Sequence, residues 1–570
     1  MVKLTIDNIP VEIKKGSTIK QAAKKVGVEI PTLCFLENIN DIGACRVCLV
    51  EIEGLERLVT ACNTPVEEDM VIYTNTVRVI DARKTNVMFI LSEHNCNCTI
   101  CVRSGNCSLQ KLANDLGILE LPYKNKPEKF KGSENFALIR DASKCIKCMR
   151  CVQICDKVQS LNIWDLAGTG SRTTVDVSHN KKIEESNCSA CGQCITHCPV
   201  GALKERDDTS KVYKMLEDKE IITVLQVAPA VRTAWAESLN LKKEEASEGK
   251  MVAAMKRIGF DYVFDTNFAA DLTIMEEGSE FVDRLVEIKE NKLPMFTSCC
   301  PGWVSFVKSQ YPSLVKQLST AKSPQQMFGA VTKTYFAKIL NVDPNKIACI
   351  SVMPCLAKKE ECDIKNINDS NAKKDVDIAL TTREFIRMLK TQHLNLKVLK
   401  EEEFDSPLGV ATGAGVIFGA TGGVMEAALR SAYFLVKGKN PSVEAFKEVR
   451  GDKGWREASF NIDDININIA IASGLSNARD LVEAILRKEV VYDFVEIMAC
   501  PGGCAGGGGQ PIHDGLELAK ARGEILYELD ENSKLRFSHE NPQINKLYEE
   551  FLESPLSKKA HHLLHTEHLI

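Results

Sequence analysis

Residues 496–511 read EIMACPGGCAGGGGQP and place two cysteines, Cys500 and Cys504, within a run of glycines. Because glycine has no Cβ, its backbone reaches positive φ angles and can approach a bulky ligand closely. Thiolates are preferred ligands of soft metals and of iron–sulfur clusters. The apolar run at residues 490–498 predicts a buried strand, so both cysteines would follow its carboxyl end, where open α/β sheets bind ligands. The stretch therefore predicts a large inorganic ligand, in preference to a glycine-rich turn with two buried thiols.

The composition excludes several classes of protein. The chain has 570 residues, enough for several domains, and its net charge of −5 argues against a nucleic-acid-binding face, which is usually basic. No uncharged run reaches the length of a membrane span. The N-terminus, MVKLTIDNIPVEI, alternates like a strand and lacks the apolar core of a signal peptide. We therefore expect a cytoplasmic protein that binds neither nucleic acid nor membrane.

Cysteine usage is the unusual feature, because 16 of the 23 cysteines fall within the first 198 residues. In a long chain without a signal peptide, clustered C-x-x-C spacings indicate metal ligands rather than disulfides. Residues 1–34 predict strand, turn, strand and helix. They lead into a C-x10-C-x2-C-x13-C pattern formed by Cys34, Cys45, Cys48 and Cys62. One loop that holds most of the ligands, plus one distant ligand, is typical of a 2Fe–2S cluster; a zinc site is the alternative.

A second pattern follows a helical segment at residues 77–91. It is H-x3-C-x2-C-x5-C, formed by His94, Cys98, Cys101 and Cys107, with Cys96 outside the spacing. Both N-terminal patterns resemble the β-grasp 2Fe–2S module and the 4Fe–4S module of the large respiratory NADH dehydrogenase subunit and of related hydrogenases. That resemblance implies that the histidine is one ligand of a 4Fe–4S cluster.

Two runs of C-x2-C-x2-C-x3-C come next, and this spacing is the signature of a bacterial two-cluster ferredoxin. In that fold the fourth cysteine of each run binds the other cluster. One cubane is therefore assigned to Cys145, Cys148, Cys151 and Cys198, and the other to Cys188, Cys191, Cys194 and Cys155. Four accessory clusters in series predict an electron relay that ends at a buried site.

Beyond residue 210 the pattern changes to alternating strands and helices. The apolar runs IITVLQVAPA, LPMFTSCC, KIACISVMPC and FVEIMAC predict strands, and REFIRMLK and MEAALRSAYFLV predict helices. Each of the four strands ends in a distinctive motif, so we expect these motifs to meet at one edge of a mostly parallel sheet.

Three of these motifs resemble the signature motifs of iron-only (FeFe) hydrogenases: TSCCPGW at 297–303, MPCLAKKEE at 353–361 and EIMACPGGCAGGGGQP at 496–511. They stand in the family's order and behind the N-terminal extension of the monomeric clostridial type. The resemblance covers essentially the whole chain and implies an α+β multidomain fold. Its parts would be a β-grasp 2Fe–2S ferredoxin domain at 1–78, a small 4Fe–4S domain with one histidine and three cysteine ligands at 79–125, a two-cluster bacterial ferredoxin-like domain at 126–209, and a large α/β catalytic domain with mostly parallel sheets at 210–570.

This resemblance implies reversible reduction of protons to H2 at an H-cluster, a 4Fe–4S cubane linked through a cysteine sulfur to a di-iron unit with CO, cyanide and a dithiolate bridge. The accessory cofactors would be one 2Fe–2S cluster and three 4Fe–4S clusters. The implied cubane ligands are Cys300, Cys355, Cys500 and Cys504, the last of them bridging to the di-iron unit.

Carried over from the family, the pocket residues would be Pro229, Ala230, Gln325, Met353, Lys358, Phe418 and Met498. Lys358 would be a charge-assisted donor to one cyanide. Some family members have serine at the position of Ala230, so a hydroxyl contact is absent here. For the two methionines, ordinary core packing is the alternative.

The acid–base chemistry is expected at Cys299, which is left free if its neighbour Cys300 binds iron. A thiol titrates close enough to neutrality to pass protons. Upstream, Glu277, Glu280 and Arg284 share one helix face at i, i+3 and i+7, for which a solvated charged face is the alternative. The family resemblance implies a proton path Cys299–Glu277–Ser319–Glu280, with Arg284 near the exit.

Electron partners are less constrained by the sequence. Ferredoxin or flavodoxin is the expected donor, and two basic segments could dock it: Lys14, Lys15, Lys20, Lys24 and Lys25, and the linker lysines Lys124, Lys126, Lys129 and Lys131. The alternatives are the catalytic subunit of an NAD-linked electron-bifurcating hydrogenase and a non-catalytic hydrogenase-like iron–sulfur assembly protein. The C-terminal histidines, His561, His562, His565 and His568, are interpreted as a solvated helix end in preference to a surface metal site.

Overall fold

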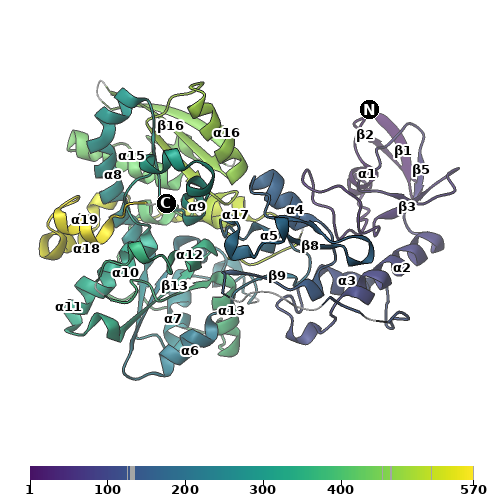
Figure 1. Cartoon of the computed structure of the whole chain (residues 1–570), viewed down its shortest axis with the longest axis horizontal. Coiled ribbons are helices and arrows are strands. Elements are labelled where there is room, and N and C mark those ends of the chain that lie inside the picture. The colour runs from purple at the N-terminus through teal and green to yellow at the C-terminus, as the bar shows by residue number, and fades with distance from the viewer. Residues whose placement is uncertain are drawn as a thin grey trace.

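The chain forms an elongated molecule in the computed structural model, with a narrower N-terminal arm and a larger C-terminal body (Figure 1). The structure describes residues 1–124, 126–128, 135–239, 241–370, 372–451, 454–462, 465–514 and 516–568. Two of the linker lysines, Lys129 and Lys131, lie outside the described residues. Within the described part, no helix combines the length and apolar character that a membrane span needs.

The N-terminal residues form a β-grasp sheet of five strands in the order β2-β1-β5-β3-β4. Its first strand alternates buried Val2, Leu4 and Ile6 with more exposed residues, which fits a sheet with one face on the core. The helix of this domain begins after Thr18, whose side chain accepts a hydrogen bond from the backbone of Gln21 in a capping box. The elements are β1 (Val2–Ile6), β2 (Ile9–Ile13), α1 (Ile19–Lys25), β3 (Leu49–Ile52), β4 (Val59–Thr60) and β5 (Val71–Tyr73).

Two small units connect this sheet to the larger body. The first is built on α2 (Val77–Glu93) and α3 (Ser108–Asp115). The second is ferredoxin-like, with two antiparallel strand pairs, β6 with β9 and β7 with β8. Its elements are β6 (Leu138–Arg140), α4 (Arg150–Gln153), β7 (Trp164–Ala167), β8 (Thr174–Val177), α5 (Gln193–Thr196) and β9 (Leu203–Glu205).

The body contains two four-stranded sheets, so the expectation of a single sheet edge was wrong. One sheet, β11-β10-β13-β14, is entirely parallel; the other, β12-β17-β16-β15, is parallel except for the pair β15 and β16. The apolar runs could not show this, because the motif-bearing strands of both sheets are buried on both faces and give the same continuous apolar pattern. The strands are β10 (Ile222–Val227), β11 (Tyr262–Asp265), β12 (Met295–Phe296), β13 (Ile347–Met353), β14 (Ile378–Thr381), β15 (Trp455–Ile462), β16 (Ile465–Ser473) and β17 (Phe494–Met498).

Helices cover both sheets and close the body. The longest is α8 (Thr266–Asn291), which carries several fully buried acidic residues, so the alternative of a solvated charged face is wrong for most of its length. The other helices of the body are α6 (Thr209–Glu217), α7 (Glu248–Ile258), α9 (Pro301–Gln310), α10 (Pro324–Val331), α11 (Ala337–Leu340), α12 (Ala357–Glu361), α13 (Thr382–Thr391), α14 (Gly413–Ile417), α15 (Gly423–Lys437), α16 (Leu475–Leu486), α17 (Ala519–Glu531), α18 (Pro542–Leu547) and α19 (Lys558–Leu564).

Candidate iron–sulfur and catalytic site

Four cysteines from three strand ends lie together between the two sheets. Cys300 follows β12 and forms the N-cap of α9, Cys355 follows β13, and Cys500 and Cys504 follow β17. Cys355 interacts electrostatically with Cys500 and Cys300, and Cys504 interacts with Cys355 and Cys300. The strands that supply them therefore belong to different sheets, and the crevice lies where their carboxyl ends face each other.

The chemistry of this donor set fits a cluster. Burial, followed by the charges of neighbouring thiols, raises the pKa of Cys355, Cys500 and Cys504. Buried thiolates of this kind need positive charge beside them, which iron supplies. Among the described residues, no group of three or more His, Cys, Asp or Glu side chains converges on one metal ion. The ligands of a cubane bind different iron atoms and need not meet at one point.

The glycines of residues 496–511 pack against protein backbone. A Cβ on Gly507 would lie 2.1 Å from the carbonyl oxygen of Pro354, and one on Gly509 would lie 2.8 Å from the backbone nitrogen of Cys355. A Cβ on Gly508 would lie 2.2 Å from the carbonyl oxygen of Cys191. These contacts are too short for any side chain, so the glycines bring the loop against the Cys355 turn and against the ferredoxin-like unit.

Lys358 is buried with its ammonium group beside the site. Its Nζ donates to the carbonyl oxygen of Cys299 at 3.1 Å and to Glu361 at 3.0 Å. Burial lowers the pKa of Lys358, but the charges of Glu361 and Cys355 raise it more, so the net direction is upward and the group stays charged. Gln325 donates from Nε2 to the carbonyl oxygen of Lys358 at 3.1 Å and to Glu361 at 2.9 Å, so its amide orients this pair.

The remaining pocket candidates are all buried. Met498 and Phe418 belong to the same apolar cluster as Cys299, whereas Met353 packs in the cluster on the other sheet. Pro229 and Ala230 follow β10, and the carbonyl oxygen of Ala230 accepts a hydrogen bond from Gln510 Nε2 at 2.8 Å. That bond ties the Pro229–Ala230 turn to the end of the glycine-rich loop.

The residues expected in the proton path lie near one another, but the contacts in the described part of the chain join only Ser319, Glu280 and Arg284 directly. Ser319 Oγ donates to Glu280 Oε2 at 2.7 Å, and Arg284 Nη1 lies 3.1 Å from Glu280 Oε1. Glu277 is fully buried; neither of its carboxyl oxygens has a hydrogen-bond partner among the described residues, although Ser319 and the backbone of Ser298 lie near enough to stabilise its charge. Burial, followed by the charge of Glu280, raises the pKa of Glu277 to about 8.

Cys299 is 8% exposed and stands at the inner end of the expected path. Burial, followed by the charge of Glu277, raises the pKa of its thiol well above the usual value. A neutral thiol and a carboxyl that titrates near neutrality are suited to holding and passing a proton. The unpartnered carboxyl of Glu277 leaves room for such an exchange.

The eight ferredoxin-type cysteines form two sets. Cys151 interacts with Cys148, Cys145 and Cys198, and these four line one small cavity. Cys194 interacts with Cys191, Cys188 and Cys155. The structure therefore brings the cysteines together in the crossed grouping that the spacing suggested, and the clusters themselves stay a prediction.

The two N-terminal sites differ in how completely they are assembled. Cys48 Sγ lies 3.3 Å from Cys62 Sγ, and Cys62 also interacts with Cys34 and Cys45, so all four thiols share one site. In the next unit, Cys107 interacts with Cys101, and Cys96 interacts with Cys98 and Cys107. His94 is buried at the C-terminal end of α2 beside Lys144.

Short contacts join the cysteine sites to one another in a branched arrangement. Asn40 Nδ2 donates to the carbonyl oxygens of Cys34 and Cys148, at 2.9 Å each. Cys107 Sγ lies 3.9 Å from the carbonyl oxygen of Pro199, the residue after Cys198. Cys500 Sγ lies 3.7 Å from the carbonyl oxygen of Cys191. Both N-terminal sites thus contact one ferredoxin-type site, and the other ferredoxin-type site contacts the catalytic crevice.

Several residues at these sites were missed by sequence reasoning. Glu361 lies inside the motif MPCLAKKEE, and its spacing of three from Lys358 could have identified it as the lysine's partner. Glu496 opens the glycine-rich motif and accepts hydrogen bonds from the backbone of Gly422 and Met425, at 2.7 Å each. Asn40 and the buried Arg103 also contact Cys148 and Cys198, respectively, and sequence reasoning could not find these contacts because those partners are distant in sequence.

Comparisons with known families match nearly the whole chain. Residues 221–508 match the iron only hydrogenase large subunit, C-terminal domain, and residues 516–569 match the iron hydrogenase small subunit. The N-terminal matches are a 2Fe–2S iron–sulfur cluster binding domain at 1–77, the NADH-ubiquinone oxidoreductase-G iron–sulfur binding region at 83–122 and a 4Fe–4S dicluster domain at 144–202.

Individual relatives agree with these matches. The chain is 46% identical to the NADP-reducing hydrogenase subunit HndD of Solidesulfovibrio fructosivorans, over 100% of this chain and 99% of that protein. It is 37% identical to iron hydrogenase 1 of Clostridium pasteurianum, over 99% of both. The solved structure of the FeFe-hydrogenase HydA1 from Chlamydomonas reinhardtii matches with 41% identity and a TM-score of 0.56, covering 63% of this chain and 98% of that one. The chain therefore belongs to the iron-only hydrogenases, with accessory iron–sulfur domains.

The glycine contacts yield a test of cluster assembly. We expect Gly507→Ala to lower the iron bound by the catalytic domain at least about twofold, because the new Cβ overlaps the Pro354 carbonyl and displaces the turn that carries Cys355. Iron and sulfide content of the anaerobically purified protein measures this. Gly523→Ala, a substitution within α17, is the control, because its new Cβ would lie 3.9 Å from the nearest atom, the Cβ of Ala420. Unchanged iron content in both variants would contradict the expectation.

Glu277 yields a test of pH dependence. The folded carboxyl keeps its proton up to a pKa of about 8, whereas the unfolded one releases it near 4.5, so this group makes stability fall as pH rises between those values. Glu277→Gln removes that contribution, and the variant should gain stability relative to the parent from pH 5 to pH 8. Urea unfolding followed by tryptophan fluorescence measures the difference. Glu290 is exposed on the same helix, and Glu290→Gln should show the same pH dependence of the unfolding free energy as the parent. If the unfolding free energies of both variants run parallel to that of the parent across this pH range, the raised pKa of Glu277 is refuted.

Proposed function

We propose that this protein reversibly reduces protons to H2 at an H-cluster held by Cys300, Cys355, Cys500 and Cys504. The observation that carries the proposal is the convergence of these four thiols from two sheets, with Cys299 and Lys358 beside them. When bound, the H-cluster supplies the open iron site and the basic group at which protons and electrons combine. Cys504 is proposed as the bridge to the di-iron unit.

The chain's own residues would bind and orient that unit. Lys358 offers an ammonium group whose position Glu361 and Gln325 fix. The backbone of Pro229 and Ala230, anchored by Gln510, offers a second polar contact. Met353, Phe418 and Met498 exclude water, which strengthens every electrostatic interaction in the pocket.

Proton delivery is proposed to follow Glu280, Ser319, Glu277 and Cys299, with Arg284 at the outer end. Arg284 holds Glu280 by a salt bridge, and Ser319 donates to the same carboxylate. Glu277 then holds a proton between Ser319 and Cys299, and its raised pKa of about 8 suits both uptake and release near neutral pH. Cys299 is the last protein group before the pocket.

Electron delivery is proposed to use one 2Fe–2S and three 4Fe–4S accessory clusters, in domains at 1–78, 79–125 and 126–209 that precede a catalytic domain at 210–570. The contacts through Asn40 and Pro199 support a branched relay, in which both N-terminal sites meet the site of Cys148 and Cys198, and the contact at Cys191 joins the other ferredoxin-type site to the crevice. His94 is proposed as a ligand of the second site on the strength of its spacing from Cys98, Cys101 and Cys107.

The electron donor has two candidates. Ferredoxin or flavodoxin is the first, on the basis of the sequence resemblance. A specific observation favours the second, an NAD(P)-linked partner subunit: the relative that is 46% identical along the full chain is named a subunit of an NADP-reducing hydrogenase.

The reaction itself is tested with Cys299→Ala. We expect the rate of H2 turnover with a chemical reductant to fall by about 10²–10⁴-fold, which is the usual contribution of a positioned acid–base group to an enzyme's rate. The iron content should be unchanged. Infrared bands of CO and cyanide should appear in both the matured parent and the variant. Absence of such bands from the matured parent would overturn the H-cluster, and normal turnover in the variant would overturn the proton path. Cys349→Ala, a buried thiol within β13, is the matched control.

The donor is tested on the purified chain alone. If an NAD(P)-linked subunit is required, the protein should evolve H2 from reduced viologen but neither from NADH nor from NADPH until its natural co-purifying subunits are added. Equal rates with reduced ferredoxin and viologen, and no stable association with other subunits, would support ferredoxin instead.

A further inference from the structure

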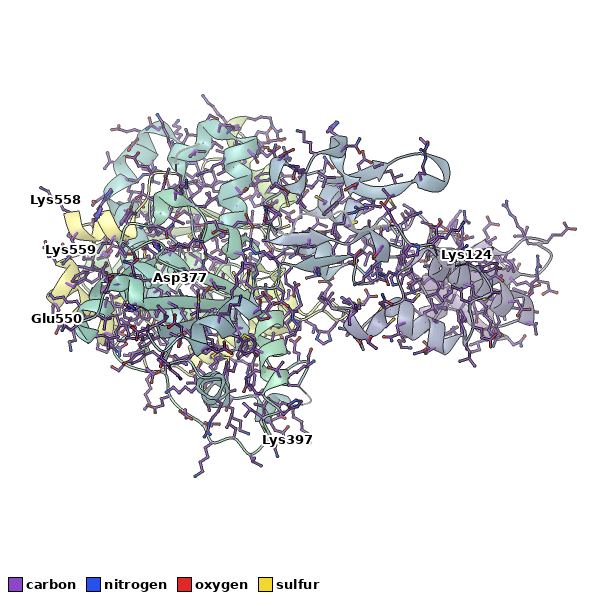
Figure 2. The ribbon with its side chains drawn as sticks, turned by 60° about the horizontal axis from the view of Figure 1, so that its bottom comes forward. Lys124, Asp377, Lys397, Glu550, Lys558 and Lys559 are labelled. Carbon is purple, nitrogen blue, oxygen red and sulfur yellow. The ribbon has the colours of Figure 1, made fainter. Side chains whose placement is uncertain are left out.

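The C-terminal segment holds a histidine pair that the sequence interpretation placed in solvent. His561 and His562 on α19 are exposed, as expected, but His565 is 3% exposed and His568 is partly buried. The interpretation was therefore wrong for His565, because the chain turns inward after α19. Lys558 and Lys559, at the start of this helix, lie on the catalytic body at the opposite end of the molecule from Lys124 (Figure 2).

This segment pairs with the backbone that carries Ser319. Thr566 N donates to the carbonyl oxygen of Thr320 at 2.8 Å, and Lys322 N donates to the carbonyl oxygen of Leu564 at 2.8 Å. An antiparallel bridge joins Ala321 and His565. The C-terminal residues thus form a short ladder along residues 320–322, directly after the serine of the proposed proton path.

Side chains reinforce the ladder at two points. His565 Nδ1 lies 2.8 Å from Thr320 Oγ1, and His568 Nε2 lies 2.9 Å from the carbonyl oxygen of Ser319. Burial lowers the pKa of His568 to about 4, so its imidazole is neutral and donates this bond from Nε2. Each histidine therefore fixes one residue of the Ser319–Thr320 pair.

His565 is itself held from the other side by Glu276, which is fully buried on α8. Glu276 Oε2 lies 3.0 Å from His565 Nε2 and accepts from Leu556 N at 2.9 Å, while Oε1 accepts from the hydroxyl of Tyr548 at 2.5 Å. His565 must carry a proton on Nε2 to meet this carboxylate. In the neutral ring, Nδ1 then accepts from the Thr320 hydroxyl.

Adjacent carboxylates on α8 consequently have opposite environments. Glu276 accepts three hydrogen bonds, all from C-terminal residues, whereas Glu277 has none among the described residues. A fully bonded buried carboxylate keeps one position, whereas an unpartnered one is free to exchange a proton. Glu276 therefore holds the C-terminal residues in place, whereas Glu277 can take up and release a proton.

We propose that His565, anchored by Glu276, is a positioning residue of the proton path that holds Ser319 and Thr320 against Glu280. The geometry supports this at the next contact, where Thr320 N donates to both oxygens of Glu280 at 3.0 Å and Ser319 Oγ donates at 2.7 Å. A shift of the 319–320 backbone would loosen three hydrogen bonds to that carboxylate at once. The proposal rests on the proposed function, since it assigns a role within that path.

The first experiment compares three single variants of the full-length matured protein. His565→Ala removes both hydrogen bonds. His565→Gln keeps a donor for Glu276 and an acceptor for Thr320. His562→Ala changes an exposed histidine of α19, the helix that precedes His565. We expect His565→Ala to lower H2 turnover about tenfold or more with unchanged iron content and infrared bands, because small displacements in a relay cost large factors in rate. His565→Gln should recover most of it, and His562→Ala should match the parent.

The second experiment reads the backbone and does not depend on turnover. In protein that carries its clusters but lacks the di-iron unit, hydrogen–deuterium exchange of residues 319–322 should accelerate about tenfold in His565→Ala and stay at the parent rate in His562→Ala. Thr320→Val, which removes only the hydroxyl partner, should show a smaller acceleration and covers the case in which His565→Ala does not fold.

The outcomes separate the two claims. An inactive parent protein with accelerated exchange in His565→Ala would remove the proposed function while leaving the positioning contact in place. Parent-like exchange in both His565→Ala and Thr320→Val would overturn the inference, as would equal loss of turnover in His565→Ala and His565→Gln.

Discussion

The structure depends on burying four thiols from two different sheets in one crevice. Cys300 and Cys355 come from strands that never pair with each other, and Cys500 and Cys504 complete the set from β17. Without metal the thiols of Cys355, Cys500 and Cys504 have raised pKa values, because burial disfavours their charged form. Deprotonated, they need iron beside them. Cluster binding and the packing of one sheet against the other are therefore coupled, because packing brings the four ligands together and iron offsets the charge of the thiolates.

The glycine-rich loop makes this coupling possible. A loop with side chains could not lie against Pro354 and Cys191 at the same time, so the crevice and the ferredoxin-like unit would separate. The close approach also brings Cys500 to the neighbouring accessory site. The same glycines thus position the cysteine ligands and bring the loop close to the ferredoxin-like unit, from which electrons are proposed to arrive. The second role depends on backbone contact between Gly508 and Cys191, which are distant in sequence.

In the proposed function, protons and electrons would reach the crevice through different groups of residues. The accessory sites approach through packed backbone and thiols, which suit electron transfer, and they extend into the N-terminal arm (Figure 1). The proposed proton path would use titratable side chains on α8, and the C-terminal residues contact the Ser319–Thr320 backbone beside it. Because the two routes use different groups, each can be altered by substitution without dismantling the other.

The cysteine spacings of the expected cluster sites, the family and the helix that carries Glu277 and Glu280 could be predicted from the sequence, because these features are local repeats and motifs. The sequence did not determine that two sheets rather than one form the crevice, since apolar runs are alike in both. Nor did it reveal Glu361 as the orienting partner of Lys358 or His565 as a buried group. Thr320 and His565 are 245 residues apart, so the tertiary fold alone brings them together. Glu361 is three residues from Lys358, but whether its carboxylate meets that lysine away from water depends on how the helix α12 packs.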